Sequence, residues 1–157
     1  MKKFARATLW TAFIIYCIGL IYVLFLSRGQ QVGFTYAEYM RRFTNFIPFK
    51  TIVEYVKRYS NGFGQLATLN LLGNLILFTP MGMALPCLSK KFNRFWKMVL
   101  YVLGMVVLVE FAQGLLLVGS VDIDDVIFNV CGAMIGYGIV KIPFINKVLG
   151  KAYLLME

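Results

Sequence analysis

The chain has 157 residues, of which 60% are hydrophobic, and its mean hydropathy of +0.74 is far above that of soluble globular domains, in which about half of the residues are apolar. It contains no histidine and only three cysteines, and its formal net charge is +9. The lack of histidine excludes Ser-His-Asp and Cys-His catalysis and argues against a zinc site.

Four long apolar runs cover residues 8–26, 66–88, 96–118 and 126–142. A helix needs about 20 residues to cross the hydrocarbon core of a bilayer, and each run has about that length. The runs are continuous rather than alternating, which argues against barrel strands. No small-x-small cleavage site follows the first run, so we interpret it as a retained span. The sequence therefore predicts an all-α fold, a four-helix transmembrane bundle, in a single membrane domain of residues 1–157.

The distribution of charge predicts how the four spans are oriented. Basic residues precede the first run, fill the link between the second and third, and follow the fourth: Lys2, Lys3, Arg6, Lys90, Lys91, Arg94, Lys97, Lys141, Lys147 and Lys151. The link between the third and fourth runs carries only the aspartates 122, 124 and 125. By the positive-inside rule both termini are cytoplasmic and the aspartate hinge faces outward. The net charge is then mainly an orientation signal, and we expect no nucleic-acid partner.

The long first link, residues 27–65, holds two capping-box patterns, Thr35-x-x-Glu38 and Thr51-x-x-Glu54. In such a box the hydroxyl and the carboxylate satisfy the free amides at the start of a helix. The patterns predict amphipathic helices at about 36–44 and 52–60. The second helix is expected to lie in the outer headgroup layer, with an ordinary solvated helix as the alternative.

Polar residues interrupt the last three spans. Ionisable groups are costly in hydrocarbon and normally face a bundle interior or a wet cavity. The residues concerned are Asn70 and Asn74 on the second span, Glu110 and Gln113 on the third, and Asp122, Asp125 and Asn129 on the fourth. At about 1.5 Å per residue they all fall in the outer half of the membrane, with Asn74 and Glu110 deepest. This predicts a polar cleft open to the outside.

Each of these polar residues also has a structural interpretation. The three asparagines are equally well explained as interhelical hydrogen-bonding groups, and Gly132-x-x-x-Gly136 is typical of close helix packing. Asp124 lies off the stripe formed by Asp122, Asp125 and Asn129, so we expect it to be a solvated hinge charge. Glu110 is the residue that packing explains least well.

Three segments resemble successive motifs of the VanZ-like family: "RFTNFIPF" (Arg42 to Phe49), "NLLGNLILFTPMGMAL" (Asn70 to Leu85), and "EFAQ" with "DIDDVIFNVCGAMIGYG" (Glu110 to Gly138). The matching motif positions are Arg42, Asn45, Pro48, Asn70, Gly73, Asn74, Pro80, Gly82, Glu110, Gln113, Asp122, Asp125, Asn129 and Gly132. Many members carry an arginine where this chain has Gly119, and the teicoplanin-type members resemble this chain there. The resemblance implies a small protein of the bacterial cytoplasmic membrane, associated with resistance to the lipid-tailed glycopeptide teicoplanin.

The leading hypothesis is a non-enzymatic one. The protein binds or shields at the outer leaflet, where its partners are membrane lipid and a lipid-tailed glycopeptide or a lipid-linked cell-wall precursor. The expected ligand-binding residues are Arg42, Asn45, Asn70, Asn74, Glu110, Gln113, Asp122, Asp125 and Asn129, with Arg41 or Arg42 as the cation beside the carboxylates. This function requires no metal or other cofactor.

Two other functions stay open at this point. A metal-dependent membrane enzyme acting on a lipid-linked envelope substrate would hold a magnesium-type ion at Asp122, Asp125 and Glu110. A small transporter or flippase would use the intramembrane carboxylate as a proton or ion site.

Overall fold

In a computed structural model, the chain is described over residues 2–60, 64–143 and 145, and this part is mainly helical. The α-helices are α1 (Lys2–Ile21), α2 (Tyr36–Arg42), α3 (Lys50–Ser60), α4 (Gly64–Leu88), α5 (Phe95–Leu116) and α6 (Ile123–Lys141). A π-helical turn, η1 (Tyr22–Leu26), extends α1, and a 3-10 turn, η2 (Lys90–Asn93), joins α4 to α5. Two short strands, β1 (Thr44–Asn45) and β2 (Val121–Asp122), complete the fold. The predicted all-α class is confirmed.

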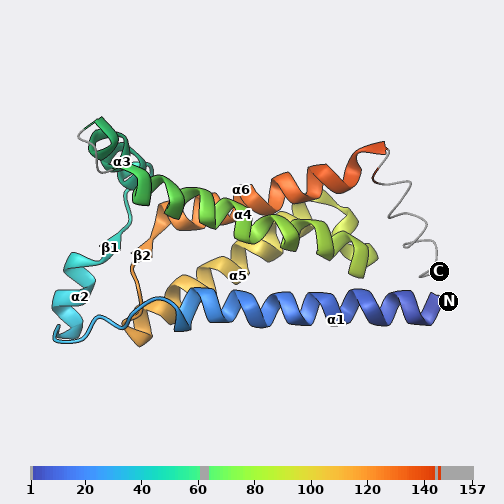
Figure 1. Cartoon of the computed structure of the whole chain (residues 1–157), viewed down its shortest axis with the longest axis horizontal. Helices are drawn as coiled ribbons and strands as arrows, with labels where there is room; N and C mark the ends of the chain where they lie inside the picture. Colours follow the sequence, from blue (N-terminus) through green and yellow to red (C-terminus); the bar gives the residue numbers. More distant parts are fainter. Residues whose placement is uncertain (1, 61–63, 144, 146–157) are drawn as a thin grey trace.

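The long helices α1, α4, α5 and α6 run roughly along the longest axis of the molecule (Figure 1). The start of α1, the turn η2 and the end of α6 lie at one end of the molecule, and α2, α3 and both strands gather at the other (Figure 1). This places the loop between α1 and α4 beside the hinge between α5 and α6.

Within the described part of the chain, three helical segments are long and apolar enough to cross a membrane: Ala7–Leu26, Phe95–Leu116 and Ile123–Lys141. Each lies within three residues of a predicted apolar run. In α4 the described apolar segment, Leu72–Leu88, is shorter. Apolar side chains of α1 face outward, since Ile15 and Ile18 are 64% and 62% exposed. An outward apolar surface of this kind is what a lipid environment favours.

The helices α4 and α6 pack against each other through glycines. A Cβ atom added at Gly132 would come closer than 3.0 Å to the main chain of Leu75, and one at Gly136 would meet Thr79 in the same way. From the other side, Gly82 lies against the main chain of Ala133. Small residues let two backbones approach this closely. The structure therefore confirms that Gly132-x-x-x-Gly136 packs helices.

The two capping boxes have different outcomes. Thr35 and Glu38 form the predicted box at the start of α2, with the Glu38 amide donating to Thr35 Oγ1 at 3.3 Å and the Thr35 amide to Glu38 Oε2 at 2.9 Å. The bonds from Thr35 hold the pKa of Glu38 below its usual value. The prediction of a second capping box, at Thr51 and Glu54, is wrong. The helix α3 already begins at Lys50, and the Thr51 hydroxyl donates to Asp122 instead. The helix α2 ends at Arg42 rather than at 44, since Thr44 enters β1.

Candidate functional site

Main-chain hydrogen bonds fasten the first loop onto the hinge between α5 and α6. The strands β1 and β2 pair in parallel, with Thr44 opposite Val121 and Asn45 opposite Asp122. The Val121 amide also donates to the Phe43 carbonyl at 2.8 Å. Nearer to α1, the Gln31 amide donates to the carbonyl of Leu117, the left-handed residue that ends α5. The loop thus brings its own side chains to the aspartates of the hinge.

Asp122 joins three parts of the structure. Its carboxylate accepts the Asp124 amide at 2.9 Å as the N-cap of α6, the Asn45 side chain at 3.0 Å, and the Thr51 hydroxyl. Its own amide donates to Glu110 Oε2 at 3.1 Å. The N-terminal end of a helix favours a negative charge, and the added donors stabilise it further. Hydrogen bonds from Asn45 to Asp122 and from Asp122 to Glu110 therefore bring these three residues together.

Asp124 is not the solvated hinge charge that the sequence suggested. It is completely buried, and its two carboxylate oxygens accept the main-chain amides of Phe49 and Thr51. The amides in the first turn of a helix have no partner within that helix, and here a carboxylate from another segment supplies one for α3. The expectation was wrong because it considered only the position of Asp124 on its own helix.

An inner cluster consists of Arg28, Asn74 and Asp125. Arg28 Nη1 lies 3.5 Å from Asp125 Oδ2, and Arg28 Nη2 donates to Asn74 Oδ1 at 3.4 Å. The Asn74 side-chain amide donates in turn to Asp125 Oδ1. Asp125 is almost fully buried, whereas the Arg28 side chain is 19% exposed. Each member thus contacts the other two, and the cluster joins the start of the first loop to α4 and α6.

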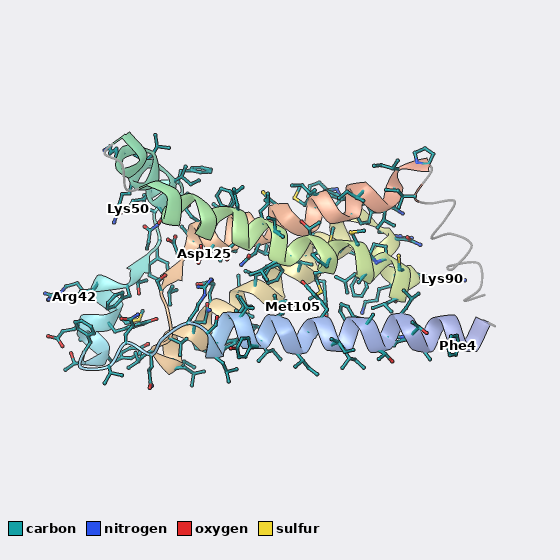
Figure 2. All side chains as sticks on the ribbon, in the orientation of Figure 1. Phe4, Arg42, Lys50, Lys90, Met105 and Asp125 are labelled. Atoms are coloured by element: carbon teal, nitrogen blue, oxygen red, sulfur yellow. The ribbon has the colours of Figure 1, made fainter. Side chains whose placement is uncertain are left out.

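The cation paired with Asp125 is Arg28, and not Arg41 or Arg42 as the sequence had suggested, although Arg42 and Asp122 line a common cavity. The Arg42 guanidinium instead lies 5.3 Å from the centre of the Phe34 ring, and Figure 2 shows Arg42 at the outer edge, away from Asp125. Arg28 stands two residues beyond η1, at the level of the hinge, and that position was the sequence signal for its role. Gly119 has a φ of +66°, and an added Cβ there would lie 3.1 Å from Arg28 Cδ. A glycine at 119 therefore leaves room for the Arg28 side chain.

The remaining predicted ligand-binding residues are Gln113, Asn129 and Asn70. Gln113 is fully buried and donates to the Leu24 carbonyl at 2.8 Å, so it joins α5 to η1. Asn129 is 2% exposed in α6. Within the described part of the chain, Gln113 Oε1 and Asn129 Oδ1 are buried without a hydrogen-bond partner. The side chain of Asn70 lies outside the described residues.

Two cavities adjoin the hinge, and we call them the apolar cavity and the polar cavity. The apolar cavity has a volume of about 270 Å³ and is lined by Tyr36, Met40, Phe46, Val107, Glu110, Phe111, Gly114, Val121, Asp122, Ile123 and Val126. The polar cavity has a volume of about 340 Å³ and is lined by Arg42, Phe43, Thr44, Asn45, Lys50, Thr51, Glu54, Ser120, Val121 and Asp122. Val121 and Asp122 line both. Of the predicted ligand-binding residues, Arg42, Asn45, Glu110 and Asp122 line one or both of these two cavities.

The carboxylates near the hinge are held by protein donors. Amides, a hydroxyl or a guanidinium contact each of Glu110, Asp122, Asp124 and Asp125. Among the described residues, no three His, Cys, Asp or Glu side chains are arranged to hold a metal ion. The magnesium hypothesis therefore gains no ligand set from the described residues.

Helices suited to a membrane and a polar loop bound over a carboxylate-bearing hinge define a small helical membrane protein with two cavities beside that hinge. The family model described as VanZ/LLP1 matches residues 13–145, and the chain belongs to this family. No curated protein and no solved structure matches the chain. The resemblance inferred from the three motifs is confirmed.

Proposed function

We propose that this member of the VanZ/LLP1 family is a multi-pass protein of the bacterial cytoplasmic membrane that binds a lipid-tailed ligand at the outer leaflet. In this proposal α1, α4, α5 and α6 are the four spans of one membrane domain, and both termini are cytoplasmic. Two features support the orientation: the start of α1 and the end of α6 lie at the same end (Figure 1), and basic residues collect there. The hinge and the first loop then face outward, with α3 at the headgroup layer.

The observation that carries the proposal is the pair of cavities sharing a wall at Val121 and Asp122. Small-molecule sites are mostly apolar, with a few polar groups that fix the orientation of the ligand. A ligand with an apolar tail and a polar head has both parts satisfied by such a pair. Glu110, 6% exposed, lies in the apolar cavity and is joined to the shared wall through the Asp122 amide.

The family resemblance narrows the class of ligand. A lipid-tailed glycopeptide of the teicoplanin type, or the lipid-linked wall precursor that such drugs recognise, has the amphiphilic character that the two cavities suit. Binding either molecule at the outer leaflet lowers the amount of drug–precursor complex, and this confers resistance without a chemical reaction. Binding without turnover is therefore sufficient for the proposed function.

The test compares Glu110→Gln with Glu38→Gln in cells challenged with teicoplanin, at equal membrane abundance. Glutamine at 110 retains an oxygen that accepts the Asp122 amide, so the fold is expected to persist while the carboxylate is lost. Glutamine at 38 also retains the capping box, and Glu38 lies outside both cavities. We expect Glu110→Gln to abolish resistance and Glu38→Gln to leave it unchanged. Full resistance in a well-expressed Glu110→Gln strain would refute the role of this site.

A further inference from the structure

The polar cavity is lined by two basic side chains, Arg42 and Lys50, to which the proposed function assigns no particular group of the ligand. We infer that Arg42 and Lys50 bind the phosphate of a lipid headgroup in the polar cavity while one acyl chain of the same molecule occupies the apolar cavity. This inference rests on the proposed function, since it assumes a lipid-tailed ligand at this site, and it names the polar group that the site recognises.

The two cations are available to a ligand. Arg42 ends α2 and Lys50 begins α3, so they stand at the two ends of the segment that holds β1 (Figure 2). Both side chains are exposed, and within the described residues neither forms an ion pair with a carboxylate. The Arg42 guanidinium lies 5.3 Å from the centre of the Phe34 ring and also interacts electrostatically with Glu38 of its own helix. A guanidinium offers a planar set of donors that matches phosphate oxygens, and an ammonium adds a mobile charge.

Two acidic residues, Asp122 and Glu54, line the same cavity, and they differ in how accessible their carboxylates are to a ligand. The Asp122 carboxylate is already held by Asn45, by Thr51 and by the Asp124 amide. Glu54 is exposed and lines the cavity as well. The lining thus presents two cations and one accessible carboxylate, and a phosphate followed by an amine, as in a phosphoethanolamine headgroup, complements both signs.

The apolar cavity is placed to receive the chain of that lipid. Its walls include Met40 and Phe46 from the loop and Val107 and Phe111 from α5. Val107 and Phe111 are 49% and 64% exposed on a helix with the composition of a membrane span, so the cavity borders the surface that faces lipid. A chain enters from the bilayer, and the shared wall at Val121 and Asp122 keeps its headgroup beside Arg42 and Lys50.

The experiment uses the full chain in maltoside micelles, which contain no phosphate, with two lipids that carry the same diazirine in one acyl chain. One is a phosphatidylethanolamine and the other is a diacylglycerol. Charge-assisted hydrogen bonds to the phosphate are expected to raise labelling by the first probe about tenfold over the second. Mass spectrometry should place the label at residues that line the apolar cavity, such as Met40, Phe46 or Val107. Equal labelling by the two probes would overturn the inference, even if no variant were made.

Variants then assign the effect to the two cavities. The double variant Arg42→Gln/Lys50→Gln should reduce phosphatidylethanolamine labelling to the diacylglycerol level, and Val107→Trp should reduce labelling by filling the apolar cavity. Arg41→Gln is the matched control, because Arg41 is exposed beside Arg42 and lines neither cavity. Undiminished labelling in a double variant with an unchanged melting temperature would also overturn the inference.

The two hypotheses fail in different ways. If Glu110→Gln abolishes teicoplanin resistance but phosphate makes no difference to labelling, the proposed function stands and the phosphate site is refuted. If phosphatidylethanolamine labels the apolar cavity while Glu110→Gln cells stay resistant, the lipid site stands and the proposed role in resistance is refuted.

Discussion

Replacing Arg28 with methionine removes the cation of the inner cluster while keeping much of the length of the side chain. At 3.5 Å, the attraction between Arg28 and Asp125 is about 5 kcal/mol for an effective dielectric constant of about 20, before desolvation is subtracted. Removing one partner of a buried pair costs about 3–5 kcal/mol, because the other charge is left buried and unpaired. Asp125 is 3% exposed, so its stranded charge is the main cost, and we expect Arg28→Met to lower the free energy of unfolding by about 3 kcal/mol.

Removing the carboxylate instead of the cation should cost less stability, because the charge left behind is that of the partly exposed Arg28. In Asp125→Asn the arginine keeps its bond to Asn74 and is 19% exposed, so water solvates part of its charge. We expect a loss of about 2 kcal/mol, the range of one hydrogen bond to a charged group. In the double variant no charge is stranded, and its loss should be smaller than the sum of the single losses by about 1–3 kcal/mol.

The assay is unfolding of the purified protein by SDS titration in mixed micelles, applied to the wild type, the two single variants and the double variant. Arg41→Met is the control, since its side chain is exposed, and its effect should stay within about 0.5 kcal/mol. Losses that add to within about 0.5 kcal/mol in the double variant would refute the ion pair as a coupled element of the site.

Three further predictions test the glycine contact between α4 and α6, the hydrogen bonds of Asp124 at the start of α3, and the membrane orientation. Gly132→Ala should lower the free energy of unfolding by about 1–3 kcal/mol, because the added methyl group meets the α4 backbone. Gly138→Ala has open space around it and should be neutral or stabilising by up to about 1 kcal/mol, and SDS titration compares the two variants. Asp124→Asn should cost about 1–2 kcal/mol, because an amide has one acceptor oxygen where the carboxylate accepts two main-chain amides, those of Phe49 and Thr51, and faster proteolysis of the loop at 43–50 would report it. In a cysteine-free background, a thiol reagent added from outside should label a cysteine at Ser120 but not one at Ser89, and the opposite pattern would reverse the proposed orientation.

Local sequence was enough to predict the long helices. The apolar run at 96–118 becomes α5 at Phe95–Leu116, and the run at 126–142 becomes most of α6 at Ile123–Lys141. A continuous apolar run of this length has no other favourable arrangement in lipid, because every backbone group must be bonded within its own segment. The glycine spacing at 132 and 136 predicted close packing for a similarly local reason, since both residues lie on one face of a helix.

The sequence did not predict the hydrogen-bond and ion-pair partners of the polar residues. Helical spacing predicted that Asp122 and Asp125 share one stripe of a helix, but Asp122 lies in β2 and caps α6, and only Asp125 is within the helix. Their partners Arg28 and Thr51 belong to a loop with no periodic pattern that connects it to α6. Asp124 and Thr51 are 73 residues apart, and they meet only because the loop folds back and pairs β1 with β2. The sequence by itself determined where the long apolar helices form, because a continuous apolar run depends only on neighbours along one segment. Only the tertiary structure decided which cation faces Asp125 and which helix Asp124 caps, because a hydrogen bond across segments depends on where the second segment returns.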